Sequence, residues 1–114
     1  MADADSPDLL ELHGDDLAAF LRDEERLVLL AFLDEGCEPC RELRPQLARL
    51  AAEQPDTCRV VTVDGARSRE DAERHGVGSF PTLVFLKRGV EVHRLRGGAL
   101  PPSTLALLGV GGEG

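Results

Sequence analysis

The sequence has few aromatic residues and few cysteines. Its 114 residues include four phenylalanines, no tyrosine, no tryptophan and three cysteines. Three cysteines are too few, and of the wrong parity, for the disulfide scaffold of a small secreted protein. No apolar run approaches the roughly 18 residues that a membrane helix needs. These absences argue against a disulfide-stapled domain and against a membrane-spanning chain.

Positive charge is also scarce. The chain has 13 Lys and Arg residues against 21 Asp and Glu residues, a net charge of −8 at pH 7. A negative surface repels phosphate backbones and anionic lipids, so we expect neither a nucleic-acid nor a membrane partner. Residues 1–8 lack the basic and apolar regions of a secretory signal, so we expect a cytoplasmic location.

Length and composition suit one folded domain. A chain that is 42% apolar and 30% charged can form a core, and its length leaves little room for a second one. We assign the domain to residues 9–109. Residues 1–8 and 110–114 have too few apolar side chains to offset the entropy of ordering them, so we predict two flexible tails.

Hydrophobic periodicity predicts alternating strands and helices. Residues 27–33 (LVLLAFL) are apolar without alternation, which is typical of a strand covered on both faces. The other expected elements are an edge strand at 9–12, helices at 15–25, 41–54 and 68–75, strands at 59–63, 82–86 and 90–95, and a last helix from Pro101 and Pro102 through Leu108. The last two strands are expected to form a hairpin. This order predicts an α/β sandwich with a central mixed β-sheet flanked by helices.

Acidic residues border the first predicted helix. Asp15 and Asp16 are placed to supply an N-cap and an acidic first turn. The run at 23–25 (DEE) is interpreted as a solvated helix end.

Cys37 and Cys40 form a C-x-x-C motif between the central strand and the next helix. With Cys37 as N-cap and Cys40 as the third helical residue, their Cα atoms would lie about 5–6 Å apart, a distance that a disulfide accepts. Cys37 then faces free backbone N–H groups and the positive end of the helix dipole, so we predict a nucleophilic thiolate. Cys40, one turn later, is predicted to be the buried resolving thiol. Pro39 costs little in a first turn.

The motif and its surroundings resemble the thioredoxin family. Residues 37–41 (CEPCR) are similar to that family's C-G-P-C-K tract, and Pro45 falls at its helix-kinking proline. Residues 79–82 (SFPT) resemble its cis-proline loop, which faces the cysteine pair, and residues 97–98 resemble its late glycine. The motifs occur in the family's order over roughly residues 12–108.

The resemblance implies a thioredoxin-like, cytoplasmic disulfide reductase that acts in electron transport and cell redox homeostasis. It would use the Cys37–Cys40 pair as a redox-active disulfide, without a bound cofactor or metal. Disulfide-containing protein substrates, an upstream disulfide reductase and a monomeric state are implied as well. The implied site comprises the catalytic pair Cys37 and Cys40, the active-site loop residues Gly36, Glu38, Pro39 and Arg41, and the substrate-binding residues Phe80, Pro81 and Gly98.

Three positions depart from the family pattern. Gly36 stands in place of the tryptophan before the first cysteine, which alters the substrate surface. Ala31 replaces the buried acid that exchanges a proton with the resolving thiol, and Val60 replaces its lysine companion. We therefore expect the resolving thiol, Cys40, to pass its proton to solvent or to Glu38. The departures also keep open an alternative function, an interaction module or co-chaperone with weak redox turnover.

The remaining cysteine and histidines offer little support for other chemistry. A zinc site needs four ligands, and Cys58, His13, His75 and His93 form no second closely spaced motif. We therefore expect no metal. Nothing in the sequence places a histidine beside the cysteine pair, as a cysteine hydrolase would require. Cys58 is interpreted as a partly buried small apolar residue, and His75 as the C-terminal residue of a helix.

Overall fold

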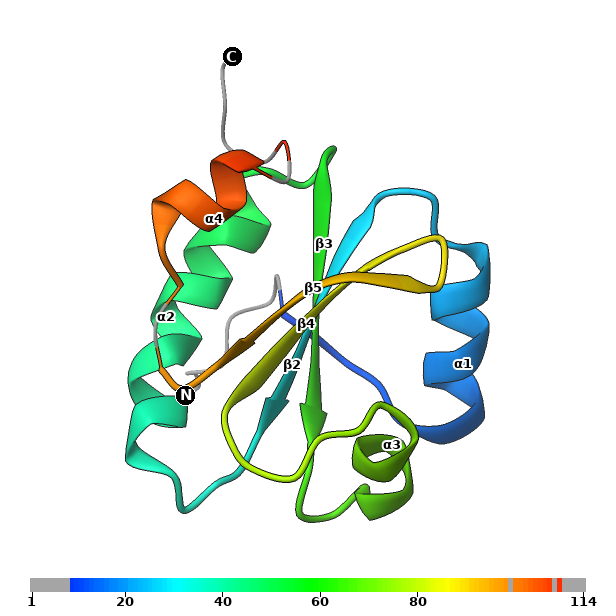
Figure 1. Ribbon diagram of the computed structural model, residues 1–114, viewed down its shortest axis with the longest axis vertical. Coiled ribbons are helices and arrows are strands. Elements are labelled where there is room, and N and C mark those ends of the chain that lie inside the picture. The colour runs from blue at the N-terminus through cyan, green and yellow to red at the C-terminus, as the bar shows by residue number, and fades with distance from the viewer. Residues whose placement is uncertain (1–8, 99, 108, 110–114) are drawn as a thin grey trace.

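The computed structural model describes residues 9–98, 100–107 and 109, and Figure 1 shows its elements. In chain order these are β1 (Leu10–Glu11), α1 (Gly14–Asp23), β2 (Leu27–Leu33), α2 (Glu38–Glu53), β3 (Cys58–Asp64), α3 (Arg69–Arg74), β4 (Thr82–Lys87), β5 (Val90–Arg96) and α4 (Pro102–Leu107). The predicted tails, and Leu108 of the last predicted helix, lie outside the described residues. Within the described part, no helix is long and apolar enough to cross a membrane.

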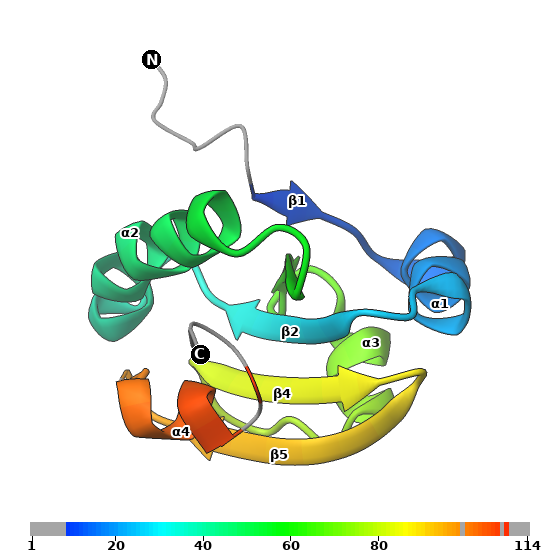
Figure 2. The same cartoon turned by 90° about the horizontal axis from the view of Figure 1, so that it is seen from above.

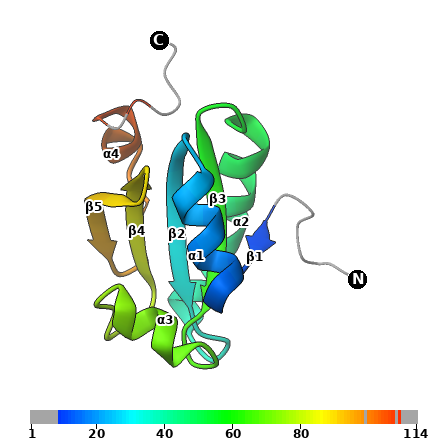
Figure 3. The same ribbon diagram turned by 90° about the vertical axis from the view of Figure 1, so that its right-hand side faces the viewer.

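The strands form one mixed sheet in the order β1-β3-β2-β4-β5, which Figure 3 shows with β5 at the left and β1 at the right. β3 pairs in parallel with β1 and β2, whereas β4 pairs antiparallel with β2 and β5. Helices α2 and α4 lie on one face of the sheet, and α1 and α3 lie on the other (Figures 1 and 2). The predicted α/β sandwich with a central mixed sheet is therefore confirmed.

Strand β2 is the centre of the core, and all seven of its residues are buried. The side chains of Leu29 and Ala31 pack into the apolar cluster under α2, while those of Leu30 and Phe32 pack into the cluster under α1 and α3. Because both faces of the strand are covered, apolar residues follow one another without alternation.

The N-terminus of α1 is capped from a distant part of the chain. Its N-cap is His13, whose side chain makes no capping hydrogen bond, and Asp15 and Asp16 lie exposed in the first turn. Instead, the buried carboxylate of Asp71 on α3 accepts a 2.9 Å hydrogen bond from the N–H of Gly14. The predicted N-cap role of the two local aspartates is wrong, because a tertiary contact supplies the acceptor, whereas the predicted acidic first turn is confirmed.

The β4–β5 hairpin contains a bulge, and the first residues of β5 are exposed. Arg88 and Gly89 form a two-residue loop with positive φ angles of 53° and 81°, which suits the twist of paired strands. A bulge then makes the register skip Val92. Val90 and Val92 are exposed, whereas Leu95 packs against the core.

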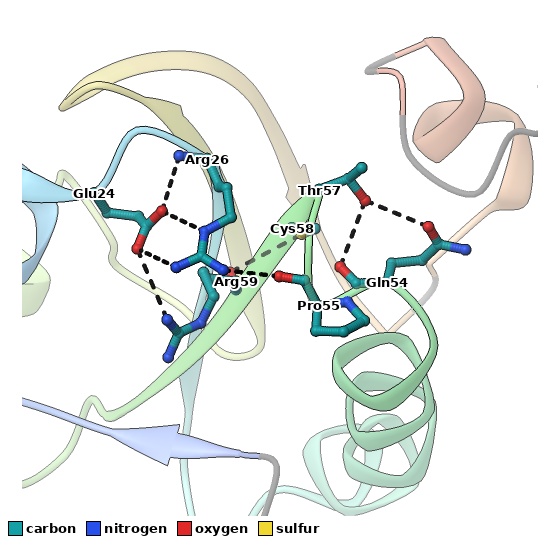
Figure 4. A network of polar contacts seen from close by, with 7 residues as sticks. All are labelled: Glu24, Arg26, Gln54, Pro55, Thr57, Cys58 and Arg59. Carbon is teal, nitrogen blue, oxygen red and sulfur yellow. Dashed lines mark hydrogen bonds and ion pairs between the residues drawn. The ribbon is translucent and has the colours of Figure 1, made fainter.

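Glu24 anchors a polar network at the turn between α1 and β2 (Figure 4). Its carboxylate accepts hydrogen bonds from Arg26 Nε at 2.6 Å and Nη2 at 3.0 Å, and it lies 3.8 Å from Arg59 Nη1. Arg26 also donates to the carbonyl of Pro55, and the guanidinium of Arg59 lies over the ring of Phe20. The hydrogen bond from Arg26 lowers the pKa of Glu24. The solvated helix end predicted for residues 23–25 is wrong for Glu24, whose side chain is 10% exposed.

The lowered pKa of His75, the C-cap of α3, should make the stability of the fold depend on pH. Burial against Phe32, whose ring centroid lies 5.7 Å from that of the imidazole, lowers the histidine pKa below its ordinary 6.5. The unfolded chain therefore takes up a proton before the folded chain does, and stability is lost as pH falls through about 6.5 toward the lowered pKa of the folded state. We expect urea unfolding to show this loss, and His75→Gln to flatten it. An exposed control, His13→Gln, should keep it; equal slopes for both variants would contradict the assignment.

Candidate active site

The two cysteines lie where β2 passes into α2. The strand ends at Leu33, and a short connection leads to Cys37, the N-cap of α2. Glu38 begins the helix, Pro39 occupies its first turn, and Cys40 is the third helical residue. The predicted placement of both cysteines is confirmed.

The structure joins Cys37 and Cys40 in a disulfide, with their Cα atoms 5.2 Å apart. The backbone N–H of Cys40 donates to Cys37 Sγ at 3.1 Å, and the N–H of Asp34 donates to Cys40 Sγ at 3.5 Å. N–H groups and the positive end of a 16-residue helix favour negative charge on sulfur. The arrangement can hold a thiolate and can alternate between dithiol and disulfide.

The two sulfurs differ in their access to solvent. Cys37 is half-buried, whereas Cys40 is 2% exposed and packs into the core cluster under α2. An external disulfide therefore reaches Cys37 first, and Cys40 stands behind it as an internal nucleophile.

The loop between α3 and β4 faces the cysteine pair. The Phe80–Pro81 peptide bond is cis, as expected from the resemblance. The carbonyl oxygen of Phe80 lies 3.8 Å from Cys37 Sγ. The N–H of Gly97, at the end of β5, donates to the carbonyl of Pro81 at 3.1 Å. Three segments that are distant in sequence therefore meet around Cys37.

The other predicted site residues near the cysteine pair are of two kinds: two glycines, and two exposed charged residues. A Cβ added at Gly98 would lie 3.0 Å from Pro39 Cβ, so only glycine allows this close approach without a shift. A Cβ added at Gly36 would meet nothing within 4 Å, so this part of the surface is open. Glu38 and Arg41 are exposed and form an ion pair at 3.7 Å.

Sequence reasoning missed Gly65, which supports the Phe80 side chain. A Cβ at Gly65 would overlap the Phe80 ring, so the ring rests directly on this glycine. A groove of about 510 Å³ opens beside it, lined in part by Ala72, Val77 and Gly78. A glycine directly after a strand was the available signal, but the contact joins residues too distant in sequence for pattern reasoning.

Sequence reasoning also missed a charged pocket of about 330 Å³ beside Cys40. Its lining includes Glu11, Asp34 and Asp64, which lie at or beside the carboxyl ends of β1, β2 and β3. The three strands are neighbours in the sheet but are separated in the sequence by helices. Their convergence follows from the topology, which local patterns do not show.

Cys58 is unsuited to exchange chemistry. It is 1% exposed at the start of β3, more deeply buried than predicted, and burial raises its pKa to about 11. We expect mild oxidation to give a Cys37–Cys40 bridge and to leave Cys58 reduced, as read by peptide mapping. Iodoacetamide at pH 8 should label Cys58 only after unfolding. A bridge that includes Cys58 would contradict this prediction.

Among the residues that the structure describes, no group of three or more His, Cys, Asp or Glu side chains is arranged to hold a metal ion. The described part of the site therefore presents two sulfurs, backbone groups and the charged pocket as its chemically active features.

Comparisons with known proteins agree on one family. Residues 8–106 match the family model described as Thioredoxin. A thioredoxin from Chlamydia trachomatis is 46% identical over 68 residues, which cover 60% of this chain and 66%, just under two thirds, of the relative. Thioredoxin 1 from Synechococcus elongatus is 35% identical, with 69% of this chain and 73% of the relative covered. The structure of a mutant thioredoxin from Halobacterium salinarum superimposes with a TM-score of 0.78 at 28% identity, over 93% of each chain.

Proposed function

The chain belongs to the thioredoxin family, and from this premise we propose that it is a thiol-disulfide oxidoreductase that reduces protein disulfides. The observation that carries the proposal is the Cys37–Cys40 disulfide at the start of α2, with one accessible and one buried sulfur. The alternative of an interaction module with weak redox turnover is not favoured, because the relatives are thioredoxins and the two cysteines form a close pair.

The reaction proceeds by two thiol-disulfide exchanges. The Cys37 thiolate attacks one sulfur of a substrate disulfide and forms a mixed disulfide with it. The substrate's own sulfur–sulfur bond breaks, and its other sulfur becomes a thiolate. Cys40 then loses its proton and attacks Cys37 Sγ, which releases the second substrate thiolate and closes the Cys37–Cys40 bridge. Two electrons pass to the substrate, and an upstream disulfide reductase must restore the dithiol.

The sulfur pair itself carries the electrons, so the proposed activity requires no bound cofactor. We further propose a monomer that acts in the cytoplasm on disulfide-containing proteins. The net charge of −8 supports a protein partner over nucleic acid or an anionic membrane, because like charges repel.

We place the substrate segment along the loop that contains Phe80. The carbonyl of Phe80 points to Cys37 and can accept a hydrogen bond from an extended peptide, in the manner of strand addition. The groove beside the Phe80 ring can receive an apolar substrate side chain. Gly36 adds no side chain to this surface, so Phe80 should supply most of its apolar contact.

Trapping of substrates tests this proposal. We expect Cys40→Ser to hold disulfide substrates as mixed disulfides on Cys37, because the resolving thiol is gone. Adding Phe80→Ala should reduce the trapped set, while alkylation of Cys37 by a small reagent should stay nearly unchanged.

The Phe80 ring also packs against both core clusters, so the unfolding curve of each variant must accompany the trapping data. Trapping that is indifferent to Phe80 would refute its binding role. A folded Cys40→Ser protein that traps nothing from lysate would count against disulfide reduction itself.

A further inference from the structure

Resolution requires the Cys40 thiol to give up a proton, and the described buried side chains that Cys40 packs with include no carboxylate or imidazole. Cys40 packs in a cluster that includes Ala31, Leu43 and Leu83, each of which is 0% exposed. Apolar side chains can neither accept a proton nor stabilise the resulting thiolate. The proton must therefore leave on another side of the sulfur.

The charged pocket provides that side. Cys40 lines it together with Asp34 and Asp64, and a volume of about 330 Å³ is room for several water molecules. Arg41 and Arg44 of α2 face the same space, so the pocket combines carboxylates with cations. Glu11, Glu35 and Arg67 complete its charged lining.

Backbone contacts hold both aspartates in place. Leu33 and Asp64 are paired across β2 and β3, and the N–H groups of Ala66 and Arg67 both donate to Asp64 Oδ1 at 3.2 Å. Asp34 follows Leu33 directly, and its own N–H donates to Cys40 Sγ. The carboxyl ends of β2 and β3 therefore place two carboxylates at the pocket that the resolving sulfur lines.

We propose that Asp34 and Asp64 accept, through water in this pocket, the proton that Cys40 releases when it resolves the mixed disulfide. The inference rests on the proposed disulfide-reductase function and names the positioning residues of its second step. In that step the proton passes to water and then to a carboxylate, the Cys40 thiolate forms the bond to Cys37 Sγ, and the substrate thiolate leaves. The sequence alone assigned the role of proton acceptor to solvent or to Glu38. The side chain of Glu38 is 73% exposed and is paired with Arg41.

The two steps of the reaction should respond differently to the pocket. Cys37 does not belong to the pocket lining and faces Phe80 instead, so the loss of a proton acceptor at the two aspartates should not slow the first step. Removal of two negative charges near Cys40 would by itself favour its thiolate and speed the second step. A loss of rate in that step therefore indicates a lost proton acceptor, not a changed electrostatic field.

The test mixes the reduced protein with an aromatic disulfide whose nitrothiophenolate product absorbs visible light. The first release reports attack by Cys37, and the second release reports resolution by Cys40. Asp34→Asn with Asp64→Asn keeps the side-chain shapes, and Asn Oδ1 can still accept from the two loop N–H groups. Glu42→Gln is the control for charge, because Glu42 is an exposed carboxylate on α2, the helix that carries Cys40.

At pH 7 we expect the double variant to lose at least about tenfold in the second release, because a general base contributes roughly 10²- to 10⁴-fold. The logarithm of that rate should rise with pH at a slope near one in the variant and more shallowly in the native protein and in Glu42→Gln. Should the double variant fail to fold, Asp34→Asn alone supports the same comparison, because it leaves the backbone donor to Cys40 intact.

An unchanged or faster second release in the variant, or the same loss in Glu42→Gln, would overturn the inference. A slower second release in Glu38→Gln, with no slowing in the aspartate variant, would also overturn it. Failure of the proposed function looks different, because the native protein would then give no second release and no Cys37–Cys40 bridge.

Discussion

Replacing Cys37 by Ser is expected to reduce disulfide-reductase activity to the rate of the reducing dithiol alone. Cys37 is the accessible sulfur at the N-terminus of α2. A serine hydroxyl at this position does not ionise near neutral pH, so it cannot replace the thiolate that attacks a disulfide. Cys40, at 2% exposure, cannot take over the first step. The measurement is the rate of reduction of a protein disulfide with a dithiol as the electron source.

Cys58→Ala is the matched control, because it removes a buried thiol at the start of β3, far from α2's first turn in the sequence. This variant should retain the native rate once it is shown to be folded. Substantial activity in a folded Cys37→Ser protein would contradict the assignment of Cys37 as the nucleophile.

The second large effect is expected for stability. Leu43 is 0% exposed on α2, three residues after Cys40, and packs in the cluster between that helix and the sheet. Leu43→Ala removes buried methyl groups and leaves a cavity, so we expect a loss of about 2–5 kcal/mol in the free energy of unfolding. That is a large part of the roughly 5–15 kcal/mol that a domain usually has. Urea unfolding followed by circular dichroism measures the loss.

Val90→Ala is the control for this prediction, because Val90 is 64% exposed in β5. It should change the free energy of unfolding by no more than about 0.5 kcal/mol. If Leu43→Ala costs no more than this exposed change, the described packing of α2 on the sheet is wrong.

Strong local patterns predicted most of the fold. The apolar run 27–33 coincides with β2, and the cysteine spacing placed the start of α2 correctly. These elements were predictable because burial on both strand faces and the geometry of a helix start each leave a local mark in the sequence. The hairpin was also predicted, but the bulge at Val92 was not, since register depends on both strands.

Features that depend on tertiary contacts could not be predicted from local patterns. The acceptor that caps α1 is Asp71, which is 57 residues from the N–H that it binds. The polar network of Glu24 and the support of Phe80 by Gly65 likewise join distant segments.

The candidate site divides in the same way. The cysteine pair and the loop at Phe80–Pro81 were found from their motifs, and the structure brings them together around Cys37. The pocket beside Cys40 was missed, because its carboxylates come from strand ends that only the sheet order places side by side. With this pocket, the proposed route of the Cys40 proton leads through water to Asp34 and Asp64, in place of the expected solvent or Glu38.

Turnover at low protein concentration tests the central claim most directly. A protein disulfide is incubated with a smaller amount of dithiol and a still smaller molar fraction of the native chain, and free substrate thiols are measured over time. The account predicts many substrate disulfides reduced per protein molecule, with the Cys37–Cys40 bridge recovered when the dithiol is exhausted. A folded chain that does not accelerate reduction beyond the dithiol alone would contradict it.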